Sequence, residues 1–449
     1  MENEKVLNSS EEYTPNPKYI LEVKNLNKYF PLNPNFFGKP QSILKAVNNV
    51  SFGVEKGKTI GIVGESGCGK TTTGRSIIRL YDITGGSVYF RGSRIAAGIR
   101  PYKAAIQDAK ELNKKEIKAA KLEKAAKIKE GMNPKLAEEE YLKVVSKSTD
   151  QYLKIVEENT KKIESAKYDH KHCNREYANA QVQKVREEYE PRILKEKNPE
   201  KLQKLNEEYK EKIRLASKDR IMNKIQMIFQ DPIASLDPRM TVRDIIAEGL
   251  IIRGIKDKKY IDEQVYKILD TVGLVPEHAS RYPHEFSGGQ RQRIGIARAI
   301  ILKPELIIAD EPISALDVSI QAQIINLLNE LSKKMGLTTL FIAHDLAVVK
   351  YFSNRIAVMY YGKIVELATS DELFAHPLHP YTRSLLSAIP LPDPYFEKKR
   401  QRIVYNPISD HDYSVEGPVM REVSPGHFVY CNSAEFETYQ QVLKEESNK

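Results

Sequence analysis

The chain has 449 residues, of which 41% are hydrophobic and 29% are charged, and it carries a formal net charge of +10. This length accommodates two or three domains with ordinary hydrophobic cores, which excludes a disordered protein. The positive net charge suits binding to nucleic acid or to an anionic membrane, but it does not decide between these partners. The three cysteines, Cys68, Cys173 and Cys431, lie too far apart for a disulfide framework or a compact zinc site, and they fit a reducing compartment.

The N-terminal region indicates a cytosolic chain. Residues 1–18 are polar, and we expect a loose tail that lacks the apolar core of a signal peptide. No run approaches the roughly 18 to 20 apolar residues that span a bilayer, so any membrane role must come through partners. Order is predicted to begin with a strand over residues 19–23, and Tyr29 and Phe30 then offer two aromatic rings.

A glycine-rich loop follows an apolar run over residues 58–64 and precedes a helical pattern over residues 72–80. Its glycines let backbone N–H groups curl around the β- and γ-phosphates of a nucleotide, while Lys70 reaches their oxygens and the Thr71 hydroxyl is placed to ligate Mg²⁺. The loop predicts a nucleotide triphosphate site but does not separate a kinase, a GTPase and a transporter motor. The phosphate-binding residues are Gly64, Glu65, Ser66, Gly67, Cys68, Gly69, Lys70, Thr71 and Thr72.

The composition changes between residues 93 and 220, after a short predicted strand over residues 87–90. Residues 101–200 contain 23 Lys and Arg and 19 Asp and Glu, and alanine is frequent. The pairs Asn133-Pro134 and Asn198-Pro199 are typical of a helix N-cap followed by proline in the first turn. We therefore predict a charged helical insertion of about three helices within a larger domain.

This insertion carries a weak coiled-coil pattern, in which positions alternate by four and three residues. We expect a helical hairpin packed on itself, with a solvated, partly frayed helix as the alternative. The mixed charges, which net +4 (23 minus 19) over residues 101–200, favour a solvated face over a docking surface for an acidic partner or RNA. The positions of this seam are Val145, Thr149, Tyr152, Val156, Asn159, Ile163 and Ala166.

A globular pattern resumes at Ile221. Strands are predicted over residues 224–229, 306–309 and 338–343, and they alternate with helices. Alternation of this kind predicts an α/β fold with a parallel sheet covered by helices. The predicted helices cover residues 241–255, 288–303, 319–334 and 346–352.

Two carboxylates, Asp310 and Glu311, close the apolar strand at residues 306–309. This is the edge at which a parallel sheet presents its ligands. Asp310 suits the ligand shell of Mg²⁺, and Glu311 suits a base that polarises an attacking water. Taken alone, the pair could equally be an ordinary polar strand end.

A second anion-binding pattern precedes the long helix predicted over residues 288–303. Ser287 and the following backbone amides form a helix N-terminus that attracts anions. Because the chain already has a phosphate loop, we expect two domains to pair head to tail, each closing the nucleotide site of the other. This pattern consists of Ser287, Gly288, Gly289 and Gln290.

The order of these motifs resembles that of the ATP-binding cassette (ABC) transporter ATPases. Along the chain the motifs are the phosphate loop, Gln230, the pattern at Ser287, the two carboxylates, Ser314–Asp317 and His344. The resemblance implies a P-loop nucleotide-binding domain with a RecA-like parallel sheet core, an antiparallel β subdomain and an α-helical signature subdomain, here with an inserted helical segment. ATP and Mg²⁺ are the cofactors that it implies.

The resemblance also implies roles for single residues. Gln230 would contact Mg²⁺ and the water while sensing the membrane subunit, and His344 would hold the γ-phosphate beside the base Glu311. Asp317, in the segment that couples the two sites, would belong to the nucleotide site. Phe30 would stack on adenine; Tyr29 is the alternative, and either ring could instead lie in the core.

Three further stretches look like the oligopeptide/dipeptide importer ATPases: residues 57–86, residues 225–232 with 235–240, and residues 376–383. Within that group, Arg239-Met240 and residues 387–394 resemble the F-type subunit. This implies a domain over residues 19–92 and 221–370, with residues 371–449 as a C-terminal extension. It also implies a peripheral protein on the cytoplasmic face of the cell membrane. Its partners would be a homologous D-type ATPase subunit in a heterodimer, two permease subunits and, indirectly, an extracytoplasmic substrate-binding protein, with no nucleic acid.

One departure from the family concerns the C-terminal tail. Many relatives carry four cysteines there that can hold an iron–sulfur cluster, whereas this tail has Cys431 alone. One thiolate cannot hold such a cluster, so we expect none.

Other functions remain open at the level of sequence. A nucleic-acid ATPase of the chromosome-maintenance type shares this motor, but its coil usually follows the glutamine loop, whereas this insertion precedes Gln230. A translation-factor ATPase would have two cassettes in one chain, and this chain has one. Importers of dipeptides or nickel share the same type of tail.

Overall fold

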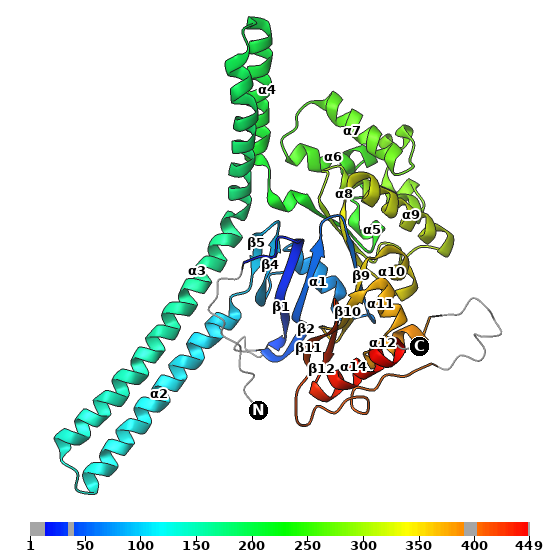
Figure 1. Ribbon diagram of the computed structural model, residues 1–449. Helices are drawn as coiled ribbons and strands as arrows, with labels where there is room; N and C mark the ends of the chain where they lie inside the picture. Colours follow the sequence, from blue (N-terminus) through cyan, green and yellow to red (C-terminus); the bar gives the residue numbers. More distant parts are fainter. Residues whose placement is uncertain (1–13, 35–39, 390–401, 448–449) are drawn as a thin grey trace.

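The computed structural model describes residues 14–34, 40–389 and 402–447 (Figure 1). Two β-sheets and a helical subdomain form the body of the protein, and long helices of the insertion lie along one side of it. Most of the predicted polar tail, and residues 390–394 of the F-type resemblance, lie outside the described residues.

An eight-stranded sheet is the main layer, with strand order β11-β12-β10-β9-β3-β8-β7-β6. The five strands from β9 to β6 in this order are parallel to one another, whereas β9 is antiparallel to β10. Every residue of β3, β7 and β8 is buried, which explains why these strands read as continuous apolar runs. Their carboxyl ends therefore meet at one edge of the sheet. The parallel strands are β3 Thr59–Val63, β6 Ile225–Ile228, β7 Leu306–Asp310, β8 Thr338–Ile342 and β9 Arg355–Tyr360.

A second, antiparallel sheet has the order β2-β1-β4-β5. Its buried side chains, among them Leu21, Val88 and Phe90, share one hydrophobic cluster with Ile60 and Ile308 of the main sheet. The two sheets are therefore held together by a common core. The strands are β1 Tyr19–Pro34, β2 Pro40–Glu55, β4 Gly85–Phe90 and β5 Ser93–Ala97.

Helices cover the main sheet and form the subdomain at the upper right of Figure 1. The helices and strands predicted from Ile221 onward are confirmed, with ends that shift by a few residues. The helices outside the insertion are α1 Lys70–Ile77, α5 Pro232–Ser235, α6 Val242–Ile252, α7 Lys258–Thr271, α8 Gly288–Ile300, α9 Val318–Met335, α10 Leu346–Phe352, α11 Ser370–Ala375, α12 Pro380–Ser387 and α14 Ser433–Ser447.

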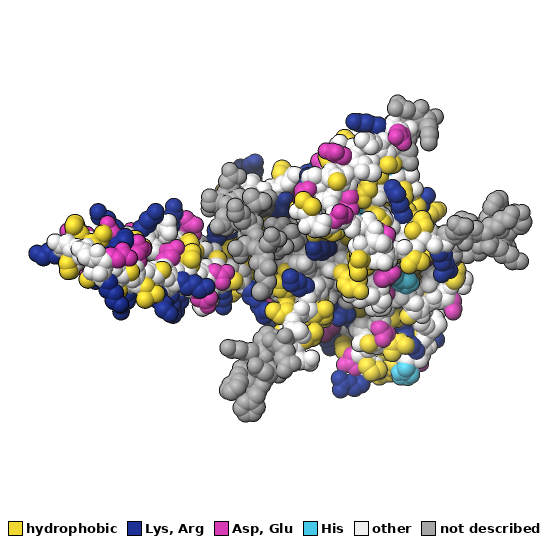
Figure 2. All heavy atoms as spheres, turned by 90° about the horizontal axis from the view of Figure 1, so that it is seen from below, with side chains coloured by type: hydrophobic (Ala, Val, Ile, Leu, Met, Phe, Trp, Pro, Cys, Tyr) yellow, Lys and Arg dark blue, Asp and Glu magenta, His cyan; other side chains and the backbone are white. Residues whose placement is uncertain are grey.

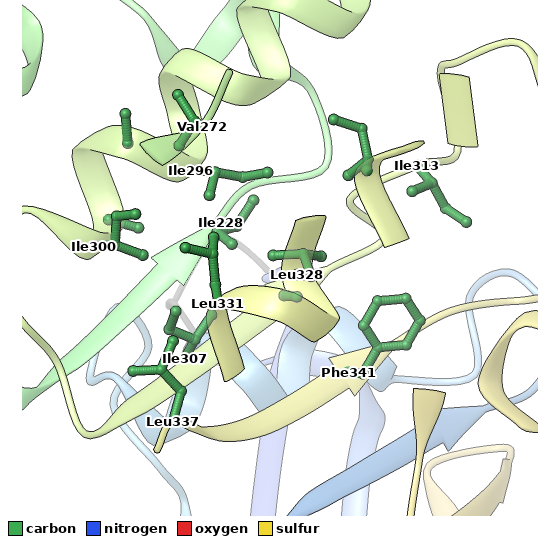
Figure 3. Close-up of a cluster of buried hydrophobic side chains, with 14 of the residues drawn as sticks. Ile228, Val272, Ile296, Ile300, Ile307, Ile313, Leu328, Leu331, Leu337 and Phe341 are labelled. Atoms are coloured by element: carbon green, nitrogen blue, oxygen red, sulfur yellow. The ribbon is translucent and has the colours of Figure 1, made fainter. Parts of the chain in front are cut away.

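A core between α8, α9 and the strands joins the helical subdomain to the sheet (Figure 3). Ile296 and Ile300 of α8 are fully buried in it, and Ile307 of β7, Leu328 of α9 and Phe341 of β8 belong to the same cluster. Burial of such side chains contributes about 1.5 to 3 kcal/mol each. The subdomain that carries the pattern at Ser287 is thus packed on the sheet that carries the phosphate loop.

The insertion contains three helices, α2 Arg100–Lys129, α3 Pro134–Lys195 and α4 Pro199–Lys218. α2 lies beside the lower half of α3 and α4 beside its upper half, so two hairpins point in opposite directions (Figure 1). Both predicted N-caps are confirmed, since Asn133 accepts a hydrogen bond from Lys135 N and Asn198 accepts hydrogen bonds from Glu200 N and Lys201 N.

The predicted seam on α3 is confirmed as the less exposed face of that helix. All seven of its positions are partly or fully buried, and Ile163 and Ala166 are buried. Ser148 donates a hydrogen bond to Asn113 of α2, and Lys124 and Lys127 of α2 form ion pairs with carboxylates of α3. Acidic and basic side chains alternate over the projecting arm in Figure 2, as expected of a solvated surface.

The middle of α3 is anchored to the nucleotide-binding body. Arg94 of β5 binds Asp169 at 2.5 Å, and Arg79 Nη2 lies 2.7 Å from His170 Nε2. Cys173 is 4% exposed and belongs to the same core cluster as β1 and β3. The helices also begin later than expected: residues 93–97, assigned to the insertion from sequence, form β5 of the antiparallel sheet, and the first helix begins at Arg100.

This anchoring separates a removable arm from an indispensable helix segment. We predict that replacing residues 114–147 by a short glycine–serine loop, which joins the neighbours Asn113 and Ser148, leaves ATP turnover within about twofold of wild type. The removed ends of α2 and α3 pair with each other, so their contacts are lost together. Deleting residues 100–215 should instead lower the unfolding temperature, since it uncovers the core face under Cys173. Thermal unfolding and ATP turnover of both variants test this, and equal stability of the two would contradict it.

The C-terminal extension completes the main sheet. β10 Lys363–Thr369 pairs with β9 and with β12 His427–Cys431, and β11 Val419–Ser424 forms the edge. A small separate core forms where β12 meets α14, around Val429 and Tyr439. The extension is thus continuous with the nucleotide-binding sheet.

Candidate active site

The phosphate loop joins β3 to α1 and ends in Lys70. A side chain at Gly69 is excluded both by backbone conformation and by space: its φ is 105°, and a Cβ there would lie 2.1 Å from the carbonyl oxygen of Ala46. The Lys70 ammonium, 3% exposed, donates to Gly64 O at 2.8 Å and to Glu65 O at 2.9 Å. The loop therefore holds a buried cation at the carboxyl end of β3.

Thr71 and Asp310 meet beside this cation. The Thr71 hydroxyl donates to Asp310 Oδ1 at 2.7 Å, whereas Asp310 Oδ2 is buried and forms no hydrogen bond, with Arg75 Nη2 3.9 Å away. Burial raises the pKa of Asp310, and the Thr71 hydrogen bond opposes this shift. A buried carboxylate oxygen that forms no hydrogen bond, on a side chain that also bonds a hydroxyl, fits a hard cation such as Mg²⁺.

Glu311 lies at the centre of the cluster. It has φ 44°, a left-handed backbone conformation that is unusual for this residue type and is found preferentially at functional sites. One carboxylate oxygen accepts a hydrogen bond from Gln230 Nε2 at 3.1 Å and lies 3.5 Å from His344 Nδ1, and the other is 3.8 Å from Lys70 Nζ. Its side chain is 14% exposed, so water reaches it.

The structure thus brings together predicted residues from four segments: the phosphate loop after β3, Gln230 after β6, the carboxylates at the end of β7 and His344 after β8. The cluster contains a buried cation, a candidate metal ligand and a carboxylate with access to water. These are the groups that phosphoryl transfer to water requires.

The pattern at Ser287 lies elsewhere, at the exposed N-terminus of α8. Ser287 Oγ accepts a hydrogen bond from Gln290 N, and the Gln290 side chain accepts one from Ser287 N, which forms a capping box. Gly288 is exposed, whereas Gly289 packs against Ile320. In the described part of the chain, no hydrogen bond or ion pair joins these residues to the phosphate loop.

Asp317 also faces solvent. It is the N-cap residue of α9 but accepts no capping hydrogen bond there, and Ser314, three residues earlier, donates to Glu311 O at 3.1 Å. The segment from Ser314 to Asp317 therefore leads from the candidate base to the surface.

The two aromatic candidates for adenine differ in their surroundings. The Phe30 ring is partly exposed, meets Tyr81 edge to face at 5.6 Å and lies 4.7 Å from Lys28 Nζ. The Tyr29 hydroxyl donates to Asn48 Oδ1 at 2.8 Å. The Phe30 ring is therefore not held by hydrogen bonds as Tyr29 is, and its contact with adenine stays a prediction.

Tyr381 contacts the phosphate loop through its side chain and was not among the predicted site residues. The backbone N–H of Glu65 donates to the hydroxyl of Tyr381 in α12 at 3.0 Å. Tyr381 lies in the stretch 376–383, which had indicated only a type of tail. Nothing in its local pattern reveals a partner 316 residues away.

Comparison with known proteins gives the family. A family model described as ABC transporter matches residues 47–216 and 193–314, which together span more than half of the chain. The chain belongs to the ABC transporter family. A second model, described as the C-terminal region of oligopeptide/dipeptide transporters, matches residues 365–414. The predicted ABC-type fold with an additional transporter-type extension is thereby confirmed.

Relatives of this ABC transporter ATPase match it over almost its whole length. The oligopeptide transport ATP-binding protein OppF of Bacillus subtilis is 44% identical over 421 residues, 94% of this chain and 98% of the relative. OppF of Streptococcus mutans is 40% identical over 427 residues, 95% of this chain and 99% of the relative. The dipeptide transport ATP-binding protein DppF of Lactococcus lactis is 40% identical over 426 residues, 94% and 97% of the two chains.

A solved structure of a dimeric ATP-binding cassette in a post-hydrolysis state with ADP and phosphate is 19% identical, with a TM-score of 0.46 and coverage of 78% of this chain and 98% of that one. Within the described ranges of this chain, no helix is both long and apolar enough to cross a lipid bilayer.

Proposed function

We propose that this chain is the ATP-hydrolysing subunit of an importer for oligopeptides. The cluster around Glu311 supports hydrolysis, since it places a carboxylate within 3.8 Å of the Lys70 ammonium and within hydrogen-bond reach of Gln230. The match of residues 365–414 to the peptide-transporter region, together with the OppF relatives, supports peptide import.

In the proposed mechanism, Glu311 accepts a proton from the attacking water, because its carboxylate is the acceptor group that lies between Lys70, Gln230 and His344. Gln230 orients that carboxylate through its amide, and His344 approaches it from the carboxyl end of the neighbouring parallel strand, β8. Lys70 keeps its two carbonyl partners, and the remaining donor of its ammonium neutralises charge on the phosphate. The protein thus contributes position and charge, which phosphoryl transfer to water chiefly needs.

ATP and Mg²⁺ are the cofactors in this proposal. The phosphate loop from Gly64 to Thr72 would hold the phosphates, and Thr71, Asp310 and Gln230 would hold the metal. When bound, Mg²⁺ would supply positive charge that neutralises the phosphate. Phe30 is proposed to stack on adenine, because its ring is partly exposed beside Lys28.

A partner subunit would complete the site. Ser287 and Asp317 are exposed, and among the described residues neither forms a hydrogen bond or ion pair with this chain's own phosphate loop, which supports a head-to-tail heterodimer with a D-type ATPase subunit. In such a dimer the capped N-terminus of α8 would offer its amides to the partner's nucleotide. Two permease subunits and an extracytoplasmic binding protein would complete the importer, with this chain peripheral on the cytoplasmic face.

An iron–sulfur cluster is not part of the proposal. Cys431 is fully buried, and burial raises the pKa of its thiol to about 12, so the thiolate that a cluster needs is disfavoured. In residues 14–34, 40–389 and 402–447, no three His, Cys, Asp or Glu side chains group as a metal site would.

The observation that carries the proposal is the cluster around Glu311 in a chain with a peptide-transporter extension. The test is to purify the chain with the membrane subunits that accompany it, reconstitute the complex in vesicles and measure ATP-dependent uptake of labelled peptides. Uptake of oligopeptides with ATP turnover is the expected result. If uptake were restricted to dipeptides or nickel, the proposed substrate would be wrong although the chain would still be an importer ATPase. Activation of the ATPase by DNA, without uptake, would indicate a nucleic-acid motor.

A further inference from the structure

The C-terminal extension contacts the phosphate loop through one side chain. Tyr381 lies in the first turn of α12 and is 2% exposed. Its hydroxyl accepts the hydrogen bond of Glu65 N at 3.0 Å. Burial raises the pKa of this phenol, so the group stays neutral at physiological pH.

The hydrogen bond from Glu65 N acts on the same peptide group that Lys70 uses. The carbonyl of Gly64 and the N–H of Glu65 belong to one planar unit, in which the carbonyl accepts from Lys70 Nζ at 2.8 Å and the N–H donates to Tyr381. Because the unit is rigid, fixing its N–H also fixes its carbonyl. Tyr381 thereby determines where the Lys70 ammonium rests.

The absence of a side chain at Gly64 lets this peptide lie close to β9. Gly64 has φ 152°, and a Cβ at this position would lie 2.1 Å from Met359 O and 2.9 Å from the sulfur of Cys68. The chain therefore passes through a narrow gap between β9 and the loop and then turns at Glu65. Without the phenol, the Glu65 N–H would have no hydrogen-bond partner among the described residues.

Tyr381 is itself held rigidly. Its ring lies 4.4 Å from that of Tyr360 and 5.5 Å from that of Tyr405, centroid to centroid. His379 is the N-cap residue of α12, and its imidazole Nδ1 accepts a hydrogen bond from Tyr381 N at 3.1 Å. The backbone N–H of His379 donates to the Glu366 carboxylate. The position of the phenol is thus set by packing and by hydrogen bonds within the extension.

We propose that Tyr381 is a positioning residue for ATP binding, through which the C-terminal extension holds the Gly64–Glu65 peptide and so places Lys70 for the phosphates. The proposal rests on ATP binding at the phosphate loop, and it does not depend on which solute is transported. It makes the extension a part of the nucleotide site as well as a part of the sheet.

The test is the substitution Tyr381→Phe, which removes one oxygen and keeps the ring. In the full-length chain, the dissociation constant of a fluorescent ATP analogue should rise about fivefold to tenfold, equivalent to about 1.0 to 1.4 kcal/mol. The KM for ATP should rise in parallel, and kcat should change less than twofold, because Glu311 and its neighbours are untouched. Adenosine, which lacks phosphates, should inhibit both proteins equally.

Tyr360→Phe is the matched control. Tyr360 belongs to the same aromatic cluster, and no hydrogen bond of its hydroxyl occurs in the described structure, so this variant should bind the ATP analogue as wild type does. An affinity of Tyr381→Phe within twofold of wild type, or an equal loss in Tyr360→Phe, would overturn the proposal. If wild type itself fails to bind the analogue, the ATPase assignment fails instead. Thermal unfolding of each variant separates a change in Lys70 position from a loss of fold.

Discussion

Glu311→Gln should bind ATP with the affinity of wild type and hydrolyse it about 10² to 10³ times more slowly, because general-base catalysis supplies a factor of this size. The amide keeps the shape of the side chain and can still bond to Gln230, which lies 3.1 Å from the present carboxylate. It cannot accept the proton of the attacking water. Steady-state turnover and equilibrium binding of ATP, measured on the same preparation, test both halves of this prediction.

An exposed glutamate, Glu330, provides the control for the Glu311→Gln substitution. Glu330 on α9 forms a surface ion pair with Lys334, and both side chains are more than 60% exposed. Glu330→Gln therefore loses the same charge without effect on turnover. If Glu311→Gln in the purified heterodimer hydrolysed ATP at near wild-type rate, another group would be the base.

His427→Leu should lower the free energy of unfolding by about 3 to 5 kcal/mol, the usual effect of leaving a buried charge without its partner. His427 and Glu366 are both fully buried, and their side chains meet at 2.8 Å. Glu366 also accepts hydrogen bonds from Leu378 N and His379 N. Without His427 this carboxylate stays buried in the sheet, and its remaining hydrogen-bond donors among the described residues are two neutral backbone N–H groups. Chemical denaturation of both proteins measures the difference.

Glu372→Gln is the control for this pair. Glu372 of α11 lies 3.3 Å from the other nitrogen of His427, but its side chain is 33% exposed, so loss of its charge should cost less than about 1 kcal/mol. A comparable loss of stability in both variants would show that the packing of β12, and not the buried pair, is responsible.

The effect of His427 should depend on pH. Burial lowers the pKa of this imidazole, but the hydrogen bond and charge of Glu366, assisted by Glu372, outweigh burial, and the net pKa is raised. A group whose pKa is higher in the folded state stabilises fully below its unfolded pKa of about 6.5, and the stabilisation is lost as pH rises through the folded value. The difference between wild type and His427→Leu should therefore be largest near pH 6 and narrow in alkaline solution.

Several elements were predictable because their causes are local. The Asn-Pro pairs predicted the starts of α3 and α4, since a cap depends on residues two or three positions away. The apolar runs of β3, β7 and β8 predicted a buried parallel sheet, and the seam on α3 predicted its packed face. The convergence of Lys70, Asp310 and Glu311 followed from the rule that parallel strands present their carboxyl ends together.

The remaining features depend on contacts between distant segments. Residues 93–97 were assigned to the insertion because the composition changes there, but pairing with β4 makes them a strand. The anchoring of α3 through Asp169 and Cys173 could not be read from a charged helical pattern, since nothing in the pattern shows what covers those positions.

The sequence alone determined the family, the phosphate loop, the candidate metal ligands and base, and the existence of a helical insertion, because each is a short pattern whose chemistry depends on near neighbours. Only the tertiary structure placed the extension in the main sheet and the hydroxyl of Tyr381 on Glu65 N. Such a contact joins residues 316 positions apart, and the hydrogen bond requires a geometry that no local pattern encodes.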